Sequence, residues 1–244
     1  MRHQEQAEAN PCFVSFVVAD ATGLNGSIPT EIGLLSDLQR LYLFSNDLAG
    51  AIPSQLGTLS SLVYLFLYNN DLTGTIPSQL GTLSSSLLSL NLDNNKLTGK
   101  IPSQLGKLST LQHLHLGNNA LNGTIPSQLG TLSSSLIELY LYVNDLTGQI
   151  PSELGKISTL QILHLSSNDL TGTIPSQLGT LSSSLIELYL YNNKLTGQIP
   201  SELGLISTLQ LLYLYNNADL TGTIPSEIDQ NQVTVTYHGT QIQS

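Results

Sequence analysis

One segment recurs along almost the whole chain and constrains the fold more than any other feature. The segment LQILHLSSNDLTGTIPSQLGTLSSS begins at Leu160, and its counterparts follow one another at intervals of 24 or 25 residues. A weaker first unit begins at Val14, so the chain holds nine units, and a second period of 49 residues indicates duplication of a two-unit block. Because repeats grow by stacking on their neighbours, the sequence predicts one elongated solenoid instead of a globular core.

The unit itself predicts a short strand followed by a turn. In Leu163-His164-Leu165, apolar and variable residues alternate with the two-residue period of a strand, so the leucines point inward and His164 points outward. Pro175 has no N–H and ends regular structure. Leu178 and Leu181 then lie three residues apart, a spacing that suits a single helical or 3₁₀ turn.

The pattern LxxLxLxxNxLxGxIPxxLGxLxx resembles the plant-type leucine-rich repeat, a family that includes receptor-kinase ectodomains and polygalacturonase-inhibiting proteins. The resemblance covers residues 14–228, and the recurring Gly-x-Ile-Pro makes it specific. It implies an α/β repeat fold: a right-handed, curved solenoid with a parallel β-sheet on the concave side and short helical or 3₁₀ turns on the convex side. It also implies an extracellular location and a protein as the ligand.

Two invariant columns within the repeat are interpreted as structural. An asparagine follows each strand, and its buried amide can pair with backbone groups that the turn leaves free. A glycine column from Gly50 to Gly222 indicates special backbone conformation or close approach of neighbouring units. The asparagines are Asn46, Asn70, Asn95, Asn119, Asn144, Asn168, Asn193 and Asn217.

The two ends of the chain depart from the repeat. Residues 1–13 are predicted to form an N-terminal extension or cap, and residues 229–244 a C-terminal cap and tail, with an edge strand at Val233–Tyr237 and a frayed end. Cys12 is the single cysteine, so the paired cysteines usual in the family's cap are missing, and a buried apolar role is expected for it. The first residues do not match a secretory signal.

Charge and composition exclude several classes of partner. The net charge is −10, which disfavours nucleic acid and anionic membrane surfaces. No apolar run is long enough to span a bilayer. Glycine-rich phosphate-binding motifs are absent from the sequence, and no cofactor is expected.

The variable strand positions carry a strong aromatic bias. Nine of the ten tyrosines fall on the outward side of the predicted concave sheet. Such a surface is typical either of cross-strand packing or of ligand recognition, and we favour recognition. The candidate ligand-binding residues are Tyr42, Phe44, Tyr64, Phe66, Tyr68, His113, His115, Glu138, Tyr140, Tyr142, Tyr189, Tyr191, Tyr213 and Tyr215.

Three of these residues raise two further hypotheses. His113 and His115 share a face, and Glu138 is expected beside His113 on the next strand. An acid–base pair or a metal site would use such residues. Because the sequence shows neither a nucleophile nor a further group supporting a ligand set, we expect neither catalysis nor a bound metal.

Threonines around each turn glycine predict a second repetitive surface. In a solenoid they would stack into two columns, similar to the surfaces of ice-binding proteins, although Lys100, Gln149 and Gln198 interrupt one column. The simpler interpretation is that small polar residues suit the second, short strand of each unit. The residues are Thr73, Thr75, Thr98, Thr124, Thr147, Thr171, Thr173, Thr196, Thr221 and Thr223.

Taken together, these patterns predict a non-catalytic recognition module that binds a protein, peptide or glycan on its aromatic concave face. The alternative is an ice-binding protein that uses the threonine columns. The sequence leaves the identity of the ligand, the compartment and the oligomeric state open.

Overall fold

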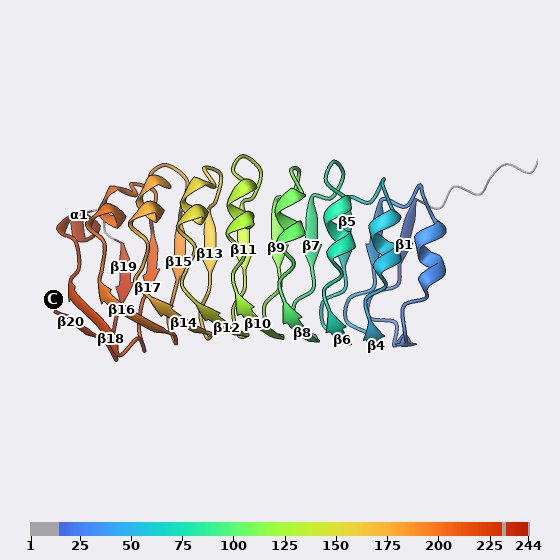
Figure 1. The fold of residues 1–244 in the computed structure, drawn as a ribbon, viewed down its shortest axis with the longest axis horizontal. Helices are drawn as coiled ribbons and strands as arrows, with labels where there is room; N and C mark the ends of the chain where they lie inside the picture. The colour runs from blue at the N-terminus through green and yellow to red at the C-terminus, as the bar shows by residue number, and fades with distance from the viewer. Residues whose placement is uncertain (1–14, 231–232, 244) are drawn as a thin grey trace, which may run out of the picture.

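A computed structural model describes residues 15–230 and 233–243. These residues form a single elongated stack of rungs, with the N-terminal rungs at one end and the C-terminal rungs at the other (Figure 1). A typical rung contributes one strand to a first sheet, one strand to a second sheet and one short helical turn. The predicted solenoid of parallel strands and 3₁₀ turns is confirmed, whereas Cys12 and the predicted N-terminal extension lie outside the described residues.

The first sheet arises from the Leu-x-Leu alternation. Within the described residues it has ten strands, and every neighbouring pair is parallel. The central leucine of a strand, such as Leu163 in β13, has no exposed surface. The strands are Phe16–Val18 (β1), Arg40–Tyr42 (β3), Tyr64–Phe66 (β5), Ser89–Asn91 (β7), His113–His115 (β9), Glu138–Tyr140 (β11), Ile162–His164 (β13), Glu187–Tyr189 (β15), Leu211–Tyr213 (β17) and Thr234–Thr236 (β19).

The second sheet follows the turn asparagine in each rung and also has ten strands in the described part of the chain. Its glycines adopt positive φ, as at Gly148 with φ 75°, a conformation that other residues adopt only at a cost. The strands are Asn25–Gly26 (β2), Asp47–Ala51 (β4), Asp71–Thr75 (β6), Lys96–Lys100 (β8), Ala120–Thr124 (β10), Asp145–Gly148 (β12), Asp169–Gly172 (β14), Lys194–Gln198 (β16), Asp219–Thr223 (β18) and Gln241–Gln243 (β20).

Short helical turns close the rungs on the side opposite the first sheet. Each 3₁₀ turn follows a proline whose extended backbone ends the preceding strand, as Pro175 does for η7. The turns stack closely, because a Cβ on Gly155 would lie 2.2 Å from the carbonyl oxygen of Gln177. They are Thr30–Leu34 (η1), Ser54–Thr58 (η2), Ser78–Thr82 (η3), Ser103–Lys107 (η4), Ser127–Thr131 (η5), Ser152–Lys156 (η6), Ser176–Thr180 (η7) and Ser201–Leu205 (η8), with the α-helix Ser226–Gln230 (α1) in the ninth place.

The asparagine column ties consecutive rungs together, as the sequence predicts. The Asn168 side-chain amide donates to the carbonyl oxygens of Leu141, Leu165 and Ser166 at 2.9 to 3.2 Å, and its oxygen accepts from the backbone N–H of Leu146 at 3.1 Å. Asn168 is 8% exposed. One side chain therefore satisfies four backbone groups on two rungs, which is the structural role expected for this column.

The C-terminal residues continue the solenoid further than the sequence suggests. The predicted edge strand is present as β19, which pairs with β17. The expectation of a frayed end is wrong, because β20 pairs with β18 and adds a strand to the second sheet as well. The side chains of Ile242 and Val235 pack against the leucine core, so this segment covers the last repeat although it lacks the consensus residues. The domain boundaries at residues 13 and 228 remain predictions.

The residue before each turn asparagine has left-handed backbone, which the repeat pattern did not reveal. Asparagine, which tolerates this region best after glycine, occupies most of these positions, but Val143 has φ 49° and is 43% exposed. We expect Val143→Asn to stabilise the protein by about 1 kcal/mol, because a β-branched residue is strained there. In the copy 49 residues later, Asn192 holds the equivalent position. Asn192→Val should therefore shift the urea unfolding midpoint in the opposite direction, and equal midpoints would contradict this reading of the strain.

Candidate ligand-binding face

The outer face of the first sheet carries two groups of stacked rings. The fourteen predicted ligand-binding residues lie on or just after its strands, and all are half-buried. In the N-terminal group, Tyr42 stacks on Phe66 with ring centroids 4.8 Å apart, and Phe44 stacks on Tyr68 at 4.5 Å. These distances match the spacing of neighbouring strands. The stacking is thus a direct result of placing aromatic residues at the same position in successive rungs.

The C-terminal group is longer and runs to the end of the sheet. His115 stacks on Tyr140 at 4.3 Å, Tyr142 on His164 at 4.7 Å, and Tyr191 on Tyr215 at 4.4 Å. Each ring also contacts a ring in its own or the adjoining rung, for example Tyr189 with Tyr213 at 5.2 Å. The rings therefore form one continuous surface from β9 to β17.

Two members of this surface are missing from the predicted ligand-binding residues, although the sequence places His164 on the outward side of its strand. His164 lies between Tyr142 and Tyr189, and its position in the Leu-x-Leu motif was a sufficient signal. His238 stacks on Tyr215 at 4.6 Å. Its segment departs from the repeat, and only the alternation through Val235 and Tyr237 could have placed it in register.

The break between the two groups is a packed structure of its own. Asp93 is 8% exposed, and its carboxylate accepts a hydrogen bond from the backbone N–H of Gly117 at 2.5 Å and from the Tyr142 hydroxyl at 3.4 Å. A Cβ on Gly117 would lie 2.3 Å from the Tyr142 ring. The missing side chain at Gly117 thus makes room for Tyr142 to lie across one rung and reach the carboxylate two rungs away.

Burial changes the protonation of this region. Removal from water raises the pKa of Asp93 to about 6, although the hydrogen bonds from Gly117 and Tyr142 oppose the change. The folded state then retains a proton that the unfolded chain, with a pKa of 3.8, has released. Because the unfolded state binds fewer protons between these values, the contribution of Asp93 to stability falls as the pH rises through this window.

His164 acts in the opposite direction. Burial lowers its pKa from 6.5 to about 4, so the unfolded chain takes up a proton that the folded state refuses, and stability falls as the pH drops through this range. The two effects oppose each other in the parent. In Asp93→Asn, we expect the free energy of unfolding to rise by about 1–2 kcal/mol from pH 4 to 6.5, because only the effect of His164 remains. In His164→Gln, we expect it to fall by about 1–2 kcal/mol from pH 4 to 6 because of Asp93. Urea unfolding across this pH range measures both slopes. Slopes of the same sign in the two variants would contradict the assignment.

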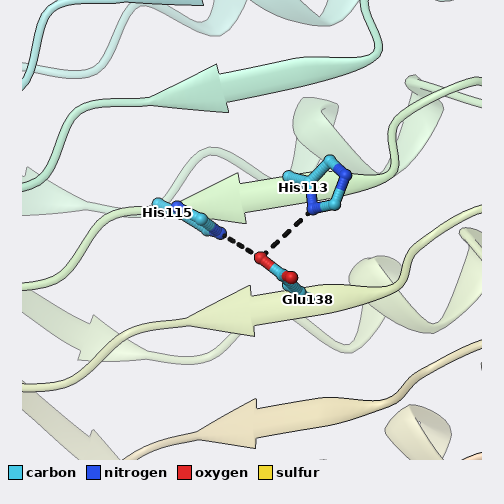
Figure 2. Close-up of side chains that lie close together, drawn as sticks. All are labelled: His113, His115 and Glu138. Atoms are coloured by element: carbon cyan, nitrogen blue, oxygen red, sulfur yellow. Dashed lines mark hydrogen bonds and ion pairs between the residues drawn. The ribbon is translucent and has the colours of Figure 1, made fainter.

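Three side chains converge at the first end of the longer ring group (Figure 2). One carboxylate oxygen of Glu138 lies 3.2 Å from Nδ1 of His113 and 2.8 Å from Nε2 of His115. The predicted placement of Glu138 beside His113 is confirmed, because the two residues are partners in the β9–β11 pairing. Burial lowers the pKa of His115, although the hydrogen bond with Glu138 acts against this. The chemistry available to this cluster is cation binding or proton exchange within a hydrogen-bonded triad.

The threonines occupy the second sheet, mostly exposed, but they do not form the two columns that the sequence suggests. Thr75 lies opposite Thr98, whereas Thr73 lies opposite Lys96. The pairing register is shifted by two residues from one rung to the next, so Gly50 lies opposite Leu72 and Gly74 opposite Leu97. A Cβ on Gly99 would lie 2.8 Å from the Thr75 methyl group. Equivalent threonines are therefore offset along the solenoid.

Comparison with known proteins shows the family to which this repeat architecture belongs. The profile of the family described as Leucine Rich Repeat matches residues 61–83, 86–108, 110–132, 135–157, 159–181 and 184–206. The chain belongs to the leucine-rich-repeat family. No curated protein sequence matches this leucine-rich-repeat protein. Among solved structures it is similar to the plant peptide hormone receptor RGFR1 in complex with RGF2, with 38% identity, a TM-score of 0.84, and coverage of 89% of this chain and 35% of that chain.

Two further structures are informative. The ectodomain of the Arabidopsis receptor kinase HAESA, in complex with an N-terminally extended IDA peptide hormone, is 36% identical with a TM-score of 0.83, over 89% of this chain and 36% of that one. A plant ice-binding protein is 32% identical with a TM-score of 0.78, over 91% of this chain and 70% of that one. The leucine-rich-repeat protein is thus of the plant type, and it spans about a third of the length of the receptor ectodomains. None of the helices in the described part of the chain has the length and hydrophobicity of a transmembrane span.

Proposed function

We propose that this leucine-rich-repeat protein is a non-catalytic recognition module that binds a peptide segment along the outer face of its first sheet. The observation that carries the proposal is the continuous ring surface from β9 to β17, whose members are half-buried. Large, rigid, amphipathic side chains provide contact area at a low entropic cost. The similarity to receptor ectodomains that are complexed with peptide hormones supports the same class of ligand.

The stacking favours a peptide over a glycan as the ligand. Sugars bind aromatic side chains through the face of a ring, but here neighbouring rings cover the faces. Tyr215, for example, has Tyr191 at 4.4 Å and His238 at 4.6 Å, both stacked on it. A ligand that meets ring edges and phenolic hydroxyl groups gains van der Waals contact and hydrogen bonds, which backbone and side-chain groups of a peptide offer.

The distribution of charge favours a basic peptide. In the described part of the chain, Arg40 is the single lysine or arginine within the strands of the first sheet. The described lysines lie on the second sheet or in the 3₁₀ turns. The face from β7 onward instead carries the carboxylates of Asp93, Glu138 and Glu187. A peptide with lysine or arginine complements the charge of this face.

A peptide selected from a random display library against the purified protein tests the proposal. We expect enrichment of lysine and arginine, and a photoreactive version of the selected peptide should crosslink to residues of β11, β15 and β17 when the products are mapped by mass spectrometry. Crosslinks confined to the second sheet or the 3₁₀ turns would overturn the proposed surface. Specific binding on a glycan array, with no peptide selected, would overturn the proposed ligand class.

Ice binding is the second candidate function, and one observation favours it. The chain covers 70% of the plant ice-binding protein at 32% identity. Two observations argue against ice binding. The threonines of successive rungs are offset by two residues. At the position after the turn glycine, every second rung has Lys100, Gln149 or Gln198 instead of threonine. Inhibition of ice recrystallisation by the purified protein, lost when Thr73, Thr171, Thr173 and Thr221 are changed to Lys, would support this function. Unchanged ice grain growth would exclude it.

A further inference from the structure

The cluster of His113, His115 and Glu138 has the geometry of a site for a transition-metal ion. Both histidines lie on β9, two residues apart and on one face, while Glu138 lies opposite on β11 (Figure 2). One ligand atom from each residue lies within 4.8 Å of the other two. Strands hold side chains more precisely than loops do, so the three donors converge without any rearrangement of the backbone.

In contrast to the expectation from the sequence, we propose from this geometry that the cluster binds a divalent zinc ion through Nδ1 of His113, Nε2 of His115 and a carboxylate oxygen of Glu138. Two imidazole nitrogens with one carboxylate form a donor set that zinc accepts, with metal–ligand bonds of about 2.0–2.2 Å. The Glu138 oxygen already lies 3.2 Å and 2.8 Å from the two nitrogens, close to the separation of ligands around a tetrahedral ion. The side chains are 17% to 33% exposed, so a fourth position remains open to water.

The surroundings of His115 support the orientation that a metal needs. Its ring stacks on Tyr140 at 4.3 Å, and its Nδ1 lies 3.4 Å from the side-chain amide of Asn91. A histidine that binds metal through one nitrogen donates the N–H of the other nitrogen to an acceptor. Asn91 Oδ1 here accepts from the backbone N–H of Asp93 at 3.0 Å, so Asn91 supplies that acceptor only when its amide turns over and gives up this bond. The ring is thus held by stacking on one side and by a polar partner at the far nitrogen.

The internal duplication provides a natural comparison for this site. Residues 49 positions later are Ile162, His164 and Glu187, so a single histidine is missing from the second copy. There, His164 Nε2 contacts the Ser166 hydroxyl at 2.7 Å, and Glu187 accepts from the Tyr189 hydroxyl at 2.7 Å. In this copy the histidine and the carboxylate therefore have other partners, Ser166 and Tyr189. Convergence of the three donors is thus specific to the first copy. The zinc proposal does not depend on the proposed peptide function.

Isothermal titration of the purified, metal-free protein with zinc chloride tests the site. We expect one zinc ion per chain, and at least about tenfold weaker binding in His113→Gln, His115→Gln and Glu138→Gln. His164→Gln is the matched control, because His164 lies on the same face outside the cluster, and its zinc affinity should equal that of the parent. Magnesium, which prefers oxygen donors, should not bind at this site.

A gain of function completes the test. Ile162→His restores the missing donor in the second copy, and we expect the stoichiometry to rise from one zinc ion to two. Circular dichroism of every variant checks that the solenoid remains folded. The proposal is overturned if the parent does not bind zinc at millimolar concentration, or if the variant with both His113→Gln and His115→Gln keeps the affinity of the parent. In either case the cluster is a hydrogen-bonded triad without a metal.

Discussion

Asn168→Ala is expected to destabilise the solenoid by about 3 kcal/mol, the largest effect on stability that we predict for a single polar side chain. The substitution removes a hydrogen-bond partner from three carbonyl groups and one N–H group on two rungs, and each of the three carbonyl groups keeps one other partner. A buried group that loses its hydrogen bond costs about 1–3 kcal/mol. Part of the loss is recovered by water that enters the vacated space, so the costs do not simply add.

Two further variants separate hydrogen bonding from packing. Asn168→Leu fills the space with apolar atoms but leaves the same backbone groups without their amide partner, so it should be no more stable than Asn168→Ala. Asn122→Ala is the matched control, because Asn122 is exposed on the second sheet, and surface substitutions usually change stability by less than about 0.5 kcal/mol. Unfolding in urea monitored by circular dichroism compares all three variants. If the midpoint of Asn168→Leu equals that of the parent, the amide is not the source of stability.

The sequence alone predicted the parts of the fold that depend on burial. Leu163 and its counterparts alternate with outward residues, and hydrophobic burial requires that alternation to face inward in every rung. The asparagine column was predictable for a related reason, because a polar residue that recurs among leucines must have buried partners. These features repeat in every unit, so each unit provides independent evidence for them.

Features that depend on one particular pair of residues could not be predicted in this way. Tyr142 reaches Asp93 across 49 residues of sequence only because Gly117 lacks a side chain between them. The offset of the threonines follows from the pairing register of the second sheet, which places Thr75 opposite Thr98 and which the consensus does not specify. His238 lies in a segment without the consensus, where only the short alternation through Val235 and Tyr237 bears on the register. Such contacts follow from the shape of single side chains, which a repeat consensus averages away.

The second large effect that we predict is a loss of peptide affinity when the aromatic face is altered. We consider a variant in which four tyrosines, on or just after β15 and β17, are changed to serine. We expect its affinity for the selected basic peptide to fall by more than about tenfold. Truncation of an aromatic anchor in an interface typically costs about 2 kcal/mol or more. The leucines beneath remain, so the core is retained, although lost ring contacts lower the stability somewhat. The substituted residues are Tyr189, Tyr191, Tyr213 and Tyr215.

The matched control changes four residues on the other sheet without adding charge. Thr73, Thr171 and Thr221 lie on β6, β14 and β18, and Thr173 directly follows β14. Replacement of these four threonines by serine should leave peptide affinity unchanged. The deciding measurement is the dissociation constant of the selected peptide for the parent and for both variants, determined by isothermal titration after circular dichroism has shown each to be folded. The account predicts that only the tyrosine variant loses affinity. If the tyrosine variant binds the peptide as tightly as the parent does, the aromatic surface serves sheet packing and the proposed function is wrong.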